Sequence, residues 1–248
     1  MLFLWIMVFS LSGTAGVLLT AATFLSFPER IQKILLPCLI SYATGTLLAA
    51  AFLGLIPHAL EHADESAVLA TVLVGILLFF LLEKIVLWRH CHNLECEVHS
   101  AAGPMILIGD TIHNFADGVV IAASFLFSIP LGIVTGLSVI AHEIPQETGD
   151  FAILLNSGYG KTRALLLNII SSLSTVPAAA VAYIALETAE DLIPYVMSIS
   201  AASFLYIALA DLSPELHTAT QLSHALRQFI LLLAGIATIL LVLYFHPE

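Results

Sequence analysis

Two short stretches of the chain contain most of the side chains that could bind a metal ion together. The first, "GDTIHNFADG", spaces Asp110, His113 and Asp117 three and four residues apart, with Asn114 beside them. In an α-helix these spacings put side chains on one stripe. Imidazole, carboxylate and amide groups together suit a borderline divalent cation such as Zn²⁺, with Fe²⁺ or Mn²⁺ as alternatives.

The second stretch, "HEIPQETGD", forms two polar rows on a helix. His142 stands four residues before Gln146, so both lie on one row. Glu143 and Glu147 form the second row, which Asp150 continues. The stretch differs from the H-E-x-x-H signature of zinc proteases because Gln146 stands in place of the second histidine. An intramembrane zinc metalloprotease, with Glu143 as the base that activates a zinc-bound water, is one alternative. The missing histidine and the proline within the turn argue against it, and we predict that the chain is not an enzyme.

The elements that must position these residues are transmembrane helices. Of the 248 residues, 60% are hydrophobic and 10% are charged, which is typical of a polytopic membrane protein. A spanning helix needs about 20 apolar residues. The apolar runs predict an all-α bundle of eight transmembrane helices, at residues 2–25, 36–57, 67–88, 104–127, 130–156, 164–186, 194–216 and 227–245. No stretch of about 100 residues is left for a soluble catalytic or nucleic-acid-binding domain.

Prolines and basic residues refine this prediction. Four prolines are expected in the first turn of a helix, where a missing N–H costs nothing: Pro37, Pro104, Pro130 and Pro194. All seven basic residues fall at alternate connections: Arg30, Lys33, Lys84, Arg89, Lys161, Arg163 and Arg227. These connections should face the cytoplasm, which leaves both termini outside. We expect a multi-pass protein of the inner membrane in a bacterium, or of the plasma or an organelle membrane in a eukaryote.

The two metal-type stripes are expected to face each other. Their helices are joined by the short connection "FSIPLG", which favours antiparallel neighbours. At about 1.5 Å of rise per residue, both stripes fall near the middle of the bilayer. An ionisable group at that depth costs a few kcal/mol and usually has a partner, a cavity or a function. Hydrogen bonding between helices is the structural alternative.

The paired motifs "HNFADG" and "HEIPQETGD" resemble the ZIP (Zrt-, Irt-like protein) family of metal transporters, most closely the subgroup whose fifth helix reads HExPHExGD. "GTLLAAAFLGLIPHALEH" and "ASFLYIALADLSPEL" are similar to the second and seventh helices of that family. The resemblance implies eight helices with both ends outside, usually in a homodimer. It implies a carrier of divalent ions into the cytoplasm through a two-metal site between helices four and five. Zn²⁺ is the expected cargo, with Fe²⁺, Mn²⁺ or Cd²⁺ possible; membrane lipid is a partner, and neither nucleic acid nor an organic cofactor is expected.

The resemblance also implies a ligand set. One ion would be held by His113, Asp117, His142 and Gln146, and its neighbour by Asn114, Asp117, Glu143 and Gln146, with Asp117 as the bridge. Gln146 departs from the subgroup, which has histidine there. A neutral amide oxygen is a weaker ligand, so the occupancy of both positions and the metal preference stay open at this point.

Other residues are predicted to line the pathway or to bind metal outside it. The pathway candidates are Asp110, Glu147, Asp150, His58, Asp211 and Glu215. Helix capping, hydrogen bonding or an ordinary polar rim are alternatives for them. Residues 89–103 are predicted to form a cytoplasmic loop that contains His90, Cys91, His92, Cys96 and His99. This loop is interpreted either as a receiving metal site or as a solvated loop with incidental metal affinity.

Two further functions remain open at this point. A metal exporter is compatible with the same residues, because sequence does not fix the direction of transport. A metal-gated receptor would bind the ion without flux. The chain contains no Walker motif, which argues against transport driven by ATP.

Overall fold

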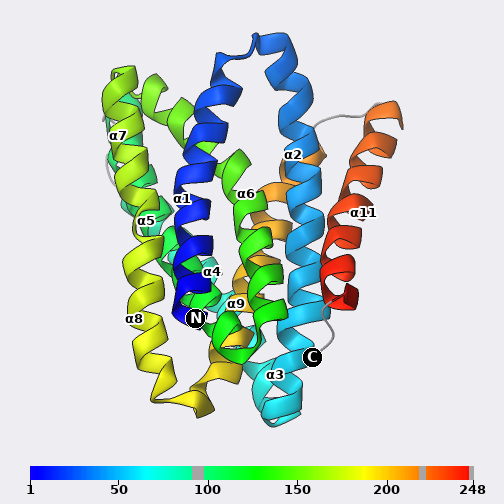
Figure 1. Cartoon of the computed structure of the whole chain (residues 1–248). Helices are drawn as coiled ribbons and strands as arrows, with labels where there is room; N and C mark the ends of the chain where they lie inside the picture. The colour runs from blue at the N-terminus through cyan, green and yellow to red at the C-terminus, as the bar shows by residue number, and fades with distance from the viewer. Residues whose placement is uncertain (91–97, 218–221, 246–248) are drawn as a thin grey trace.

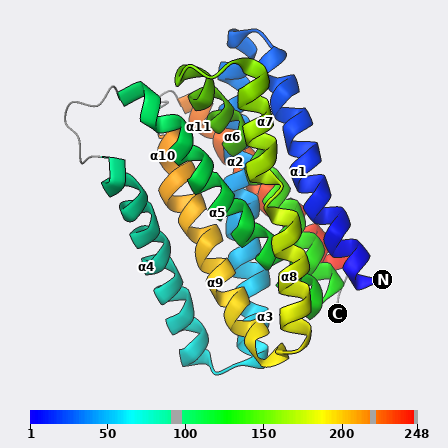
Figure 2. The same ribbon diagram turned by 90° about the vertical axis from the view of Figure 1, so that its left-hand side faces the viewer.

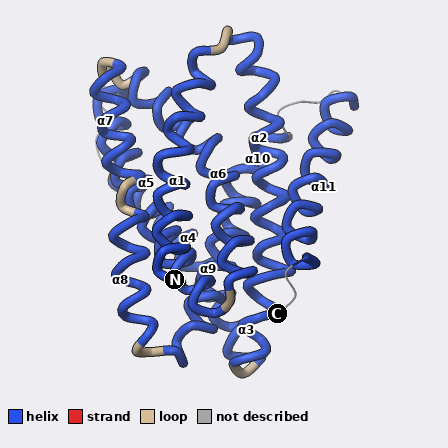
Figure 3. Tube along the Cα trace, in the orientation of Figure 1, coloured by secondary structure: helices blue, strands red, loops and turns tan. Residues whose placement is uncertain are grey.

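The computed structural model describes residues 1–90, 98–217 and 222–245, and every regular element in these ranges is helical (Figures 1 and 3). The elements form eight segments that run along the bundle: α1 (Leu2–Ser26); α2, η1 and α3 (Glu29–Ala49, Ala50–Leu55, Ile56–His62); α4 (Glu65–His90); α5 (Val98–Phe127); α6 (Ile129–Asn156); α7 and α8 (Lys161–Ser172, Thr175–Glu187); η2, α9, η3 and α10 (Glu190–Leu192, Ile193–Tyr206, Ile207–Leu212, Ser213–Leu216); and α11 (Leu222–Phe245). The prediction of an all-α fold is confirmed.

Six of the helical segments in the described ranges are long and apolar enough to cross a membrane: Glu29–His62, Glu65–Ile85, Ile106–Phe127, Lys161–Glu187, Glu190–Leu212 and Leu222–Phe245. A shorter apolar helix, Leu2–Thr14, belongs to α1. The polar row that begins at His142 lowers the apolar character of α6. The chain is therefore a polytopic membrane protein.

Two of the four prolines do not lie where the sequence predicted them. Pro130 and Pro194 lie in the first turns of α6 and α9, as expected. Pro37 and Pro104 lie inside α2 and α5, because these helices begin earlier, at Glu29 and Val98. Apolar composition marks only the part of a helix suited to the membrane, and the helices continue beyond it into polar sequence.

The segment predicted at 164–186 is broken in its middle, between α7 and α8. Pro177 has no N–H to donate to the carbonyl of Leu173, so the regular hydrogen-bond ladder cannot continue there. Tighter bonds replace it: the Ser174 N–H donates to Ser171 O (3.0 Å), and the Val176 N–H donates to Leu173 O (3.2 Å). Two other segments contain π-helical turns, η1 and η3, a feature that recurs at functional sites.

Small residues let several helix backbones approach closely. A Cβ on Gly45 of α2 would lie 2.1 Å from Leu232 O of α11, and a Cβ on Gly118 of α5 would lie 2.2 Å from Thr175 O of α8. The α2–α11 and α5–α8 pairs are accordingly among the most extensive contacts of the bundle. Helix α4 lies at the margin, where it packs mainly on α9 (Figure 2).

The connections with basic residues gather at one end of the bundle. The α1–α2 turn and the starts of α7 and α11 lie at the upper end in Figure 1. Helix α3, η2, the start of α1 and the end of α11 lie toward the opposite end. Arg30, Lys161 and Arg227 therefore share one end, in agreement with their placement at alternate connections.

Candidate metal centre

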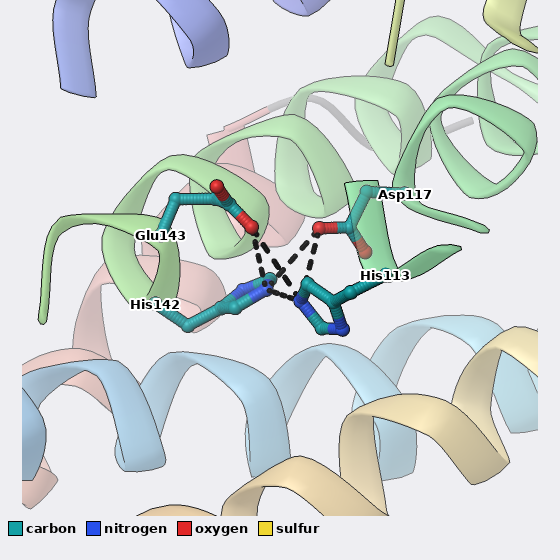
Figure 4. A group of neighbouring side chains, drawn as sticks. All are labelled: His113, Asp117, His142 and Glu143. Atoms are coloured by element: carbon teal, nitrogen blue, oxygen red, sulfur yellow. Dashed lines mark hydrogen bonds and ion pairs between the residues drawn. The ribbon is translucent and has the colours of Figure 1, made fainter. Parts of the chain in front are cut away.

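Four side chains from two adjacent helices converge inside the bundle (Figure 4). His113 and Asp117 come from α5, and His142 and Glu143 come from α6. The Nε2 atoms of the two histidines are 3.0 Å apart. Asp117 Oδ2 lies 3.2 Å from His142 Nε2 and 3.5 Å from His113 Nε2. Glu143 Oε1 lies 3.5 Å from His113 Nε2 and 3.7 Å from His142 Nε2.

A tight turn between α5 and α6 brings the two stripes face to face. Ser128 caps α6, because its hydroxyl oxygen accepts from the Leu131 N–H at 3.3 Å. The Thr135 hydroxyl then donates to the Ser124 hydroxyl oxygen at 2.9 Å, which ties the two helices together above the turn. The meeting of the stripes agrees with the arrangement predicted from helical spacing and the short connection.

A hydrogen bond on the side of the ring away from the centre fixes the orientation of His142. Its Nδ1 lies 2.9 Å from Ser138 O. A carbonyl oxygen can only accept, so Nδ1 carries the proton and Nε2 presents its lone pair to the centre. This is the tautomer that a metal-binding histidine needs. The Ser138 hydroxyl also donates to Thr46 O of α2 at 3.3 Å, which links the metal centre to a third helix.

The oxygen atoms of the centre lack ordinary partners. Both carboxylate oxygens of Asp117, and Oε1 of Glu143, are buried without a hydrogen-bond partner. The side chains of His142, Asp117 and Glu143 are 0%, 1% and 4% exposed, whereas His113 retains 17%. Two ionised carboxylates buried this deeply are costly unless a cation compensates them. Two imidazoles and two carboxylates carry a net charge of −2, so the donor set fits a divalent ion such as Zn²⁺.

The two amide residues that were predicted as further ligands are drawn toward Asp110. Asn114 Nδ2 donates to Asp110 Oδ1 at 2.9 Å, and Asn114 Oδ1 accepts from the Thr175 hydroxyl at 3.0 Å. Gln146 is half-buried, and its amide interacts electrostatically with the Asp110 carboxylate. The centre is thus formed by two histidines and two carboxylates, His113, Asp117, His142 and Glu143. The amides of Asn114 and Gln146 belong to a neighbouring polar network around Asp110.

That network contains the three predicted pathway carboxylates beside the centre: Asp110, Glu147 and Asp150, which are all buried. Helix α7 supplies their partners through two consecutive serines. The Ser171 hydroxyl donates to Asp110 Oδ2 at 2.5 Å, and the Ser172 hydroxyl donates to Glu147 Oε1. Asp150 lies beside Asp110, and Glu147 Oε2 is buried without a hydrogen-bond partner.

Sequence reasoning did not identify these serines or Thr175. The available signal was the polar cluster "NIISS" at residues 168–172, which follows the apolar run 164–167 and comes immediately before the turn at residues 173–174.

Two further pathway candidates, His58 and Asp211, do not belong to the four-residue centre. His58 Nδ1 lies 2.7 Å from Gly54 O, and the ring packs edge-on against Phe127 (centroids 5.3 Å apart). Asp211 is exposed on η3, within electrostatic reach of Glu83, His113 and His142. Glu83 accepts a hydrogen bond from the Tyr206 hydroxyl and is a second pathway candidate that the sequence did not reveal.

Some predicted ligands are not described. Cys91, His92 and Cys96 lie outside the described residues. His90 ends α4 and His99 lies in the first turn of α5, but their side chains, like that of Glu215, are also outside the description. Part of the loop predicted at 89–103 is helical: residues 89–90 belong to α4, and residues 98–103 belong to α5.

The chain is similar in sequence to known zinc transporters. Residues 89–243, which are more than half of the chain and include all four residues of the centre, match the family described as ZIP Zinc transporter. The chain is 33% identical over 218 residues to zinc transporter ZIP13 of Pongo abelii, a match that covers 82% of this chain and 65% of the relative. It is 29% identical over 272 residues to zinc transporter zipt-7.1 of Caenorhabditis briggsae, with 84% of this chain and 69% of the relative covered. With human zinc transporter ZIP4 it shares 41% identity over 112 residues, or 45% of this chain and 17% of the relative.

The chain therefore spans about two thirds of the length of the first two relatives and a small part of the third. Family membership groups it with transporters and not with enzymes, which removes the protease alternative. On the extent of these matches, the chain belongs to the ZIP zinc transporter family.

Proposed function

We propose that the chain carries divalent metal ions, with zinc as the principal cargo, across the membrane into the cytoplasm through the centre formed by α5 and α6. The observation that carries this proposal is the group of four buried side chains with unpartnered carboxylate oxygens: His113, Asp117, His142 and Glu143. A divalent ion would satisfy the two charges and the two imidazole lone pairs together.

The composition of the centre favours passage over permanent binding. A transported ion must lose its water to enter and must still be released, so its ligands have to be of moderate strength and open to a route. Mixed imidazole and carboxylate ligands meet this need better than a closed site of four thiolates. His113 is the most exposed of the four groups, which supports an access route on its side of the centre. We place Asp211 and Glu83 on this route, because Asp211 interacts electrostatically with both His113 and Glu83.

The direction of transport is inferred from charge. Basic residues gather at one end of the bundle, and the positive-inside rule assigns that end to the cytoplasm. The chain termini would then lie outside. The acidic residues of the opposite end, among them Asp64 and Glu65, would attract cations before entry.

The relatives support zinc as the cargo, because ZIP13, zipt-7.1 and ZIP4 are each named zinc transporters. Three finer features stay part of the proposal: a homodimer, closest similarity to the HExPHExGD subgroup, and a second ion next to the first. The second ion would require Asn114 and Gln146 to turn from Asp110 toward the centre. Fe²⁺, Mn²⁺ and Cd²⁺ are further candidate cargoes.

Flux into proteoliposomes that contain a zinc-sensitive dye tests the proposal. We expect zinc entry with the wild-type chain and loss of entry with His142→Ala. Asp191→Asn is the matched control, because Asp191 is an exposed carboxylate of η2 that does not belong to the centre, and the flux of this variant should stay near that of the wild type. Zinc binding without flux would support a receptor. Zinc flux only from the side of the basic end to the opposite side would support an exporter. Either result would overturn the proposal.

A further inference from the structure

A pocket unrelated to the metal centre lies between α2 and α11. It has a volume of about 540 Å³ and is lined by Cys38, Ser223, Leu226, Arg227, Ile230 and Leu231. The two helices are held together farther along by close backbone contacts at Gly45 and Gly235. Helix α11 supplies five of these lining residues and α2 supplies Cys38, and the packing of the two helices fixes their relative position.

The pocket contains one cation, and part of that cation lacks a partner. Arg227 is half-buried, and its Nε is buried with no hydrogen-bond partner. A guanidinium stays charged under all ordinary conditions and offers five N–H donors in a planar fork. A buried donor without an acceptor has lost its hydrogen bond to water without compensation, and this loss is larger for a charged donor. The geometry that best satisfies such a fork is a carboxylate or a phosphate.

The lining residues of α11 run from polar to apolar along one face. Ser223, Arg227 and Ile230 follow one another at spacings of four and three residues, so they form one stripe. Ser223 and Arg227 lie in the first two turns of α11, and Ile230 and Leu231 lie deeper. The stripe thus offers a charged end near the end of the bundle and an apolar end toward its middle.

Further basic residues lie at the same end of the bundle, and one of them, Lys33, is 3.8 Å from the Glu29 carboxylate. Arg30 and Lys33 lie in the first turns of α2, at the same end of the bundle as the start of α11 (Figure 1). Both are exposed. A cluster of basic residues at the end of a membrane helix attracts anionic lipids.

We infer that this pocket binds one anionic phospholipid, with the lipid phosphate on the Arg227 guanidinium and an acyl chain along Leu226, Ile230 and Leu231. The order of the stripe matches the order of headgroup and tail in a lipid. A free phosphate ion would leave the apolar half of the pocket unused, and a neutral zwitterionic lipid would carry an ammonium group toward the basic residues.

Native mass spectrometry of the purified chain tests the inference without any metal. The protein is released from detergent after incubation with phosphatidylglycerol or with phosphatidylcholine of the same acyl chains. We expect the wild type to retain phosphatidylglycerol at least about tenfold better than Arg227→Gln does, which corresponds to the loss of one charge-assisted interaction. Arg30→Gln removes an exposed cation at the same end of the bundle and should change retention less than threefold.

A second variant keeps the charge and fills the pocket. Ile230→Trp should weaken retention of phosphatidylglycerol while Arg227 remains in place, which separates lipid binding from misfolding caused by loss of the arginine. Equal retention of the two lipids by the wild type, or unchanged retention in Arg227→Gln, would overturn the inference. Displacement of the lipid by millimolar inorganic phosphate, with no effect of Ile230→Trp, would show a free-anion site instead and would also overturn it.

Discussion

Replacing Asp117 by asparagine should stabilise the metal-free protein and weaken its response to zinc. The ligand atoms of the centre, which include one oxygen each of Asp117 and Glu143, all lie within 4.8 Å of one another. At an effective dielectric constant of about 20, two unit charges at that distance repel each other by about 3.5 kcal/mol. Asparagine is nearly the same size and removes one charge, so at a pH at which both carboxylates are ionised Asp117→Asn relieves at least about that amount in the absence of metal. With zinc bound the sign reverses, because the ion loses an anionic ligand.

The assay is thermal unfolding in detergent micelles, with chelator and then with saturating zinc. For a chain of this size, about 3.5 kcal/mol corresponds to a rise of about 7 to 14 °C in Tm for the metal-free variant. We expect zinc affinity to fall at least about a hundredfold, or about 2.7 kcal/mol, so the zinc-induced rise in Tm should largely disappear. Asp191→Asn, in which an exposed carboxylate is changed, should leave both Tm values within about 1 °C, because isolated surface substitutions have small effects. A less stable metal-free variant that keeps the full zinc response would refute the reasoning.

Three further predictions concern other parts of the chain. Gln146→His should tighten zinc binding about tenfold by calorimetry, since imidazole is a better zinc ligand than an amide oxygen; unchanged or weaker binding would contradict this. Asp64 directly precedes α4 and caps it, because its carboxylate accepts from the Ala67 N–H at 3.0 Å, so Asp64→Ala should lower Tm and Asp64→Asn should lower it less. The Ser66 hydroxyl holds the pKa of Asp64 below its ordinary value of 3.8. The stabilisation by the ionised Asp64 carboxylate is therefore present above pH 3.8 and is lost as the pH falls through the lower pKa of the folded state. A Tm difference between wild type and Asp64→Ala that persists below the folded-state pKa would contradict this prediction. Gly45→Ala puts a methyl group 2.1 Å from a backbone oxygen of α11 and should destabilise the bundle by about 1–3 kcal/mol in thermal unfolding, whereas Gly109→Ala, with no atom within 4 Å of the new Cβ, should not.

The features that depend on local sequence could be predicted. Long apolar runs indicate the helical segments, and the three- and four-residue spacings in α5 and α6 place His113 and Asp117 on one stripe and His142 on another. The short connection between these helices then leaves facing stripes as the simplest arrangement. The four-residue cluster follows from these two facts, and the structure contains it.

The features that depend on a third helix could not be predicted. Asn114 was expected to face an ion, but its amide lies between Asp110 and Thr175, and Thr175 belongs to α8. Nothing in the spacing along α5 indicates which helix will pack against its flank. For the same reason, the serines of α7 that bind Asp110 and Glu147 were not recognised: Ser171 lies 61 residues and Ser172 lies 25 residues from its partner.

Anomalous diffraction at the zinc absorption edge, on crystals of the protein grown with zinc, tests the central claim most directly. The account predicts an anomalous peak about 2.0–2.2 Å from the Nε2 atoms of His113 and His142 and from an oxygen of Asp117 or Glu143, the distances usual for zinc with nitrogen and oxygen ligands. The peak should be absent from crystals of Asp117→Asn grown in the same way. If zinc appears only at exposed acidic residues, while the two imidazoles remain in contact with each other, the account is contradicted.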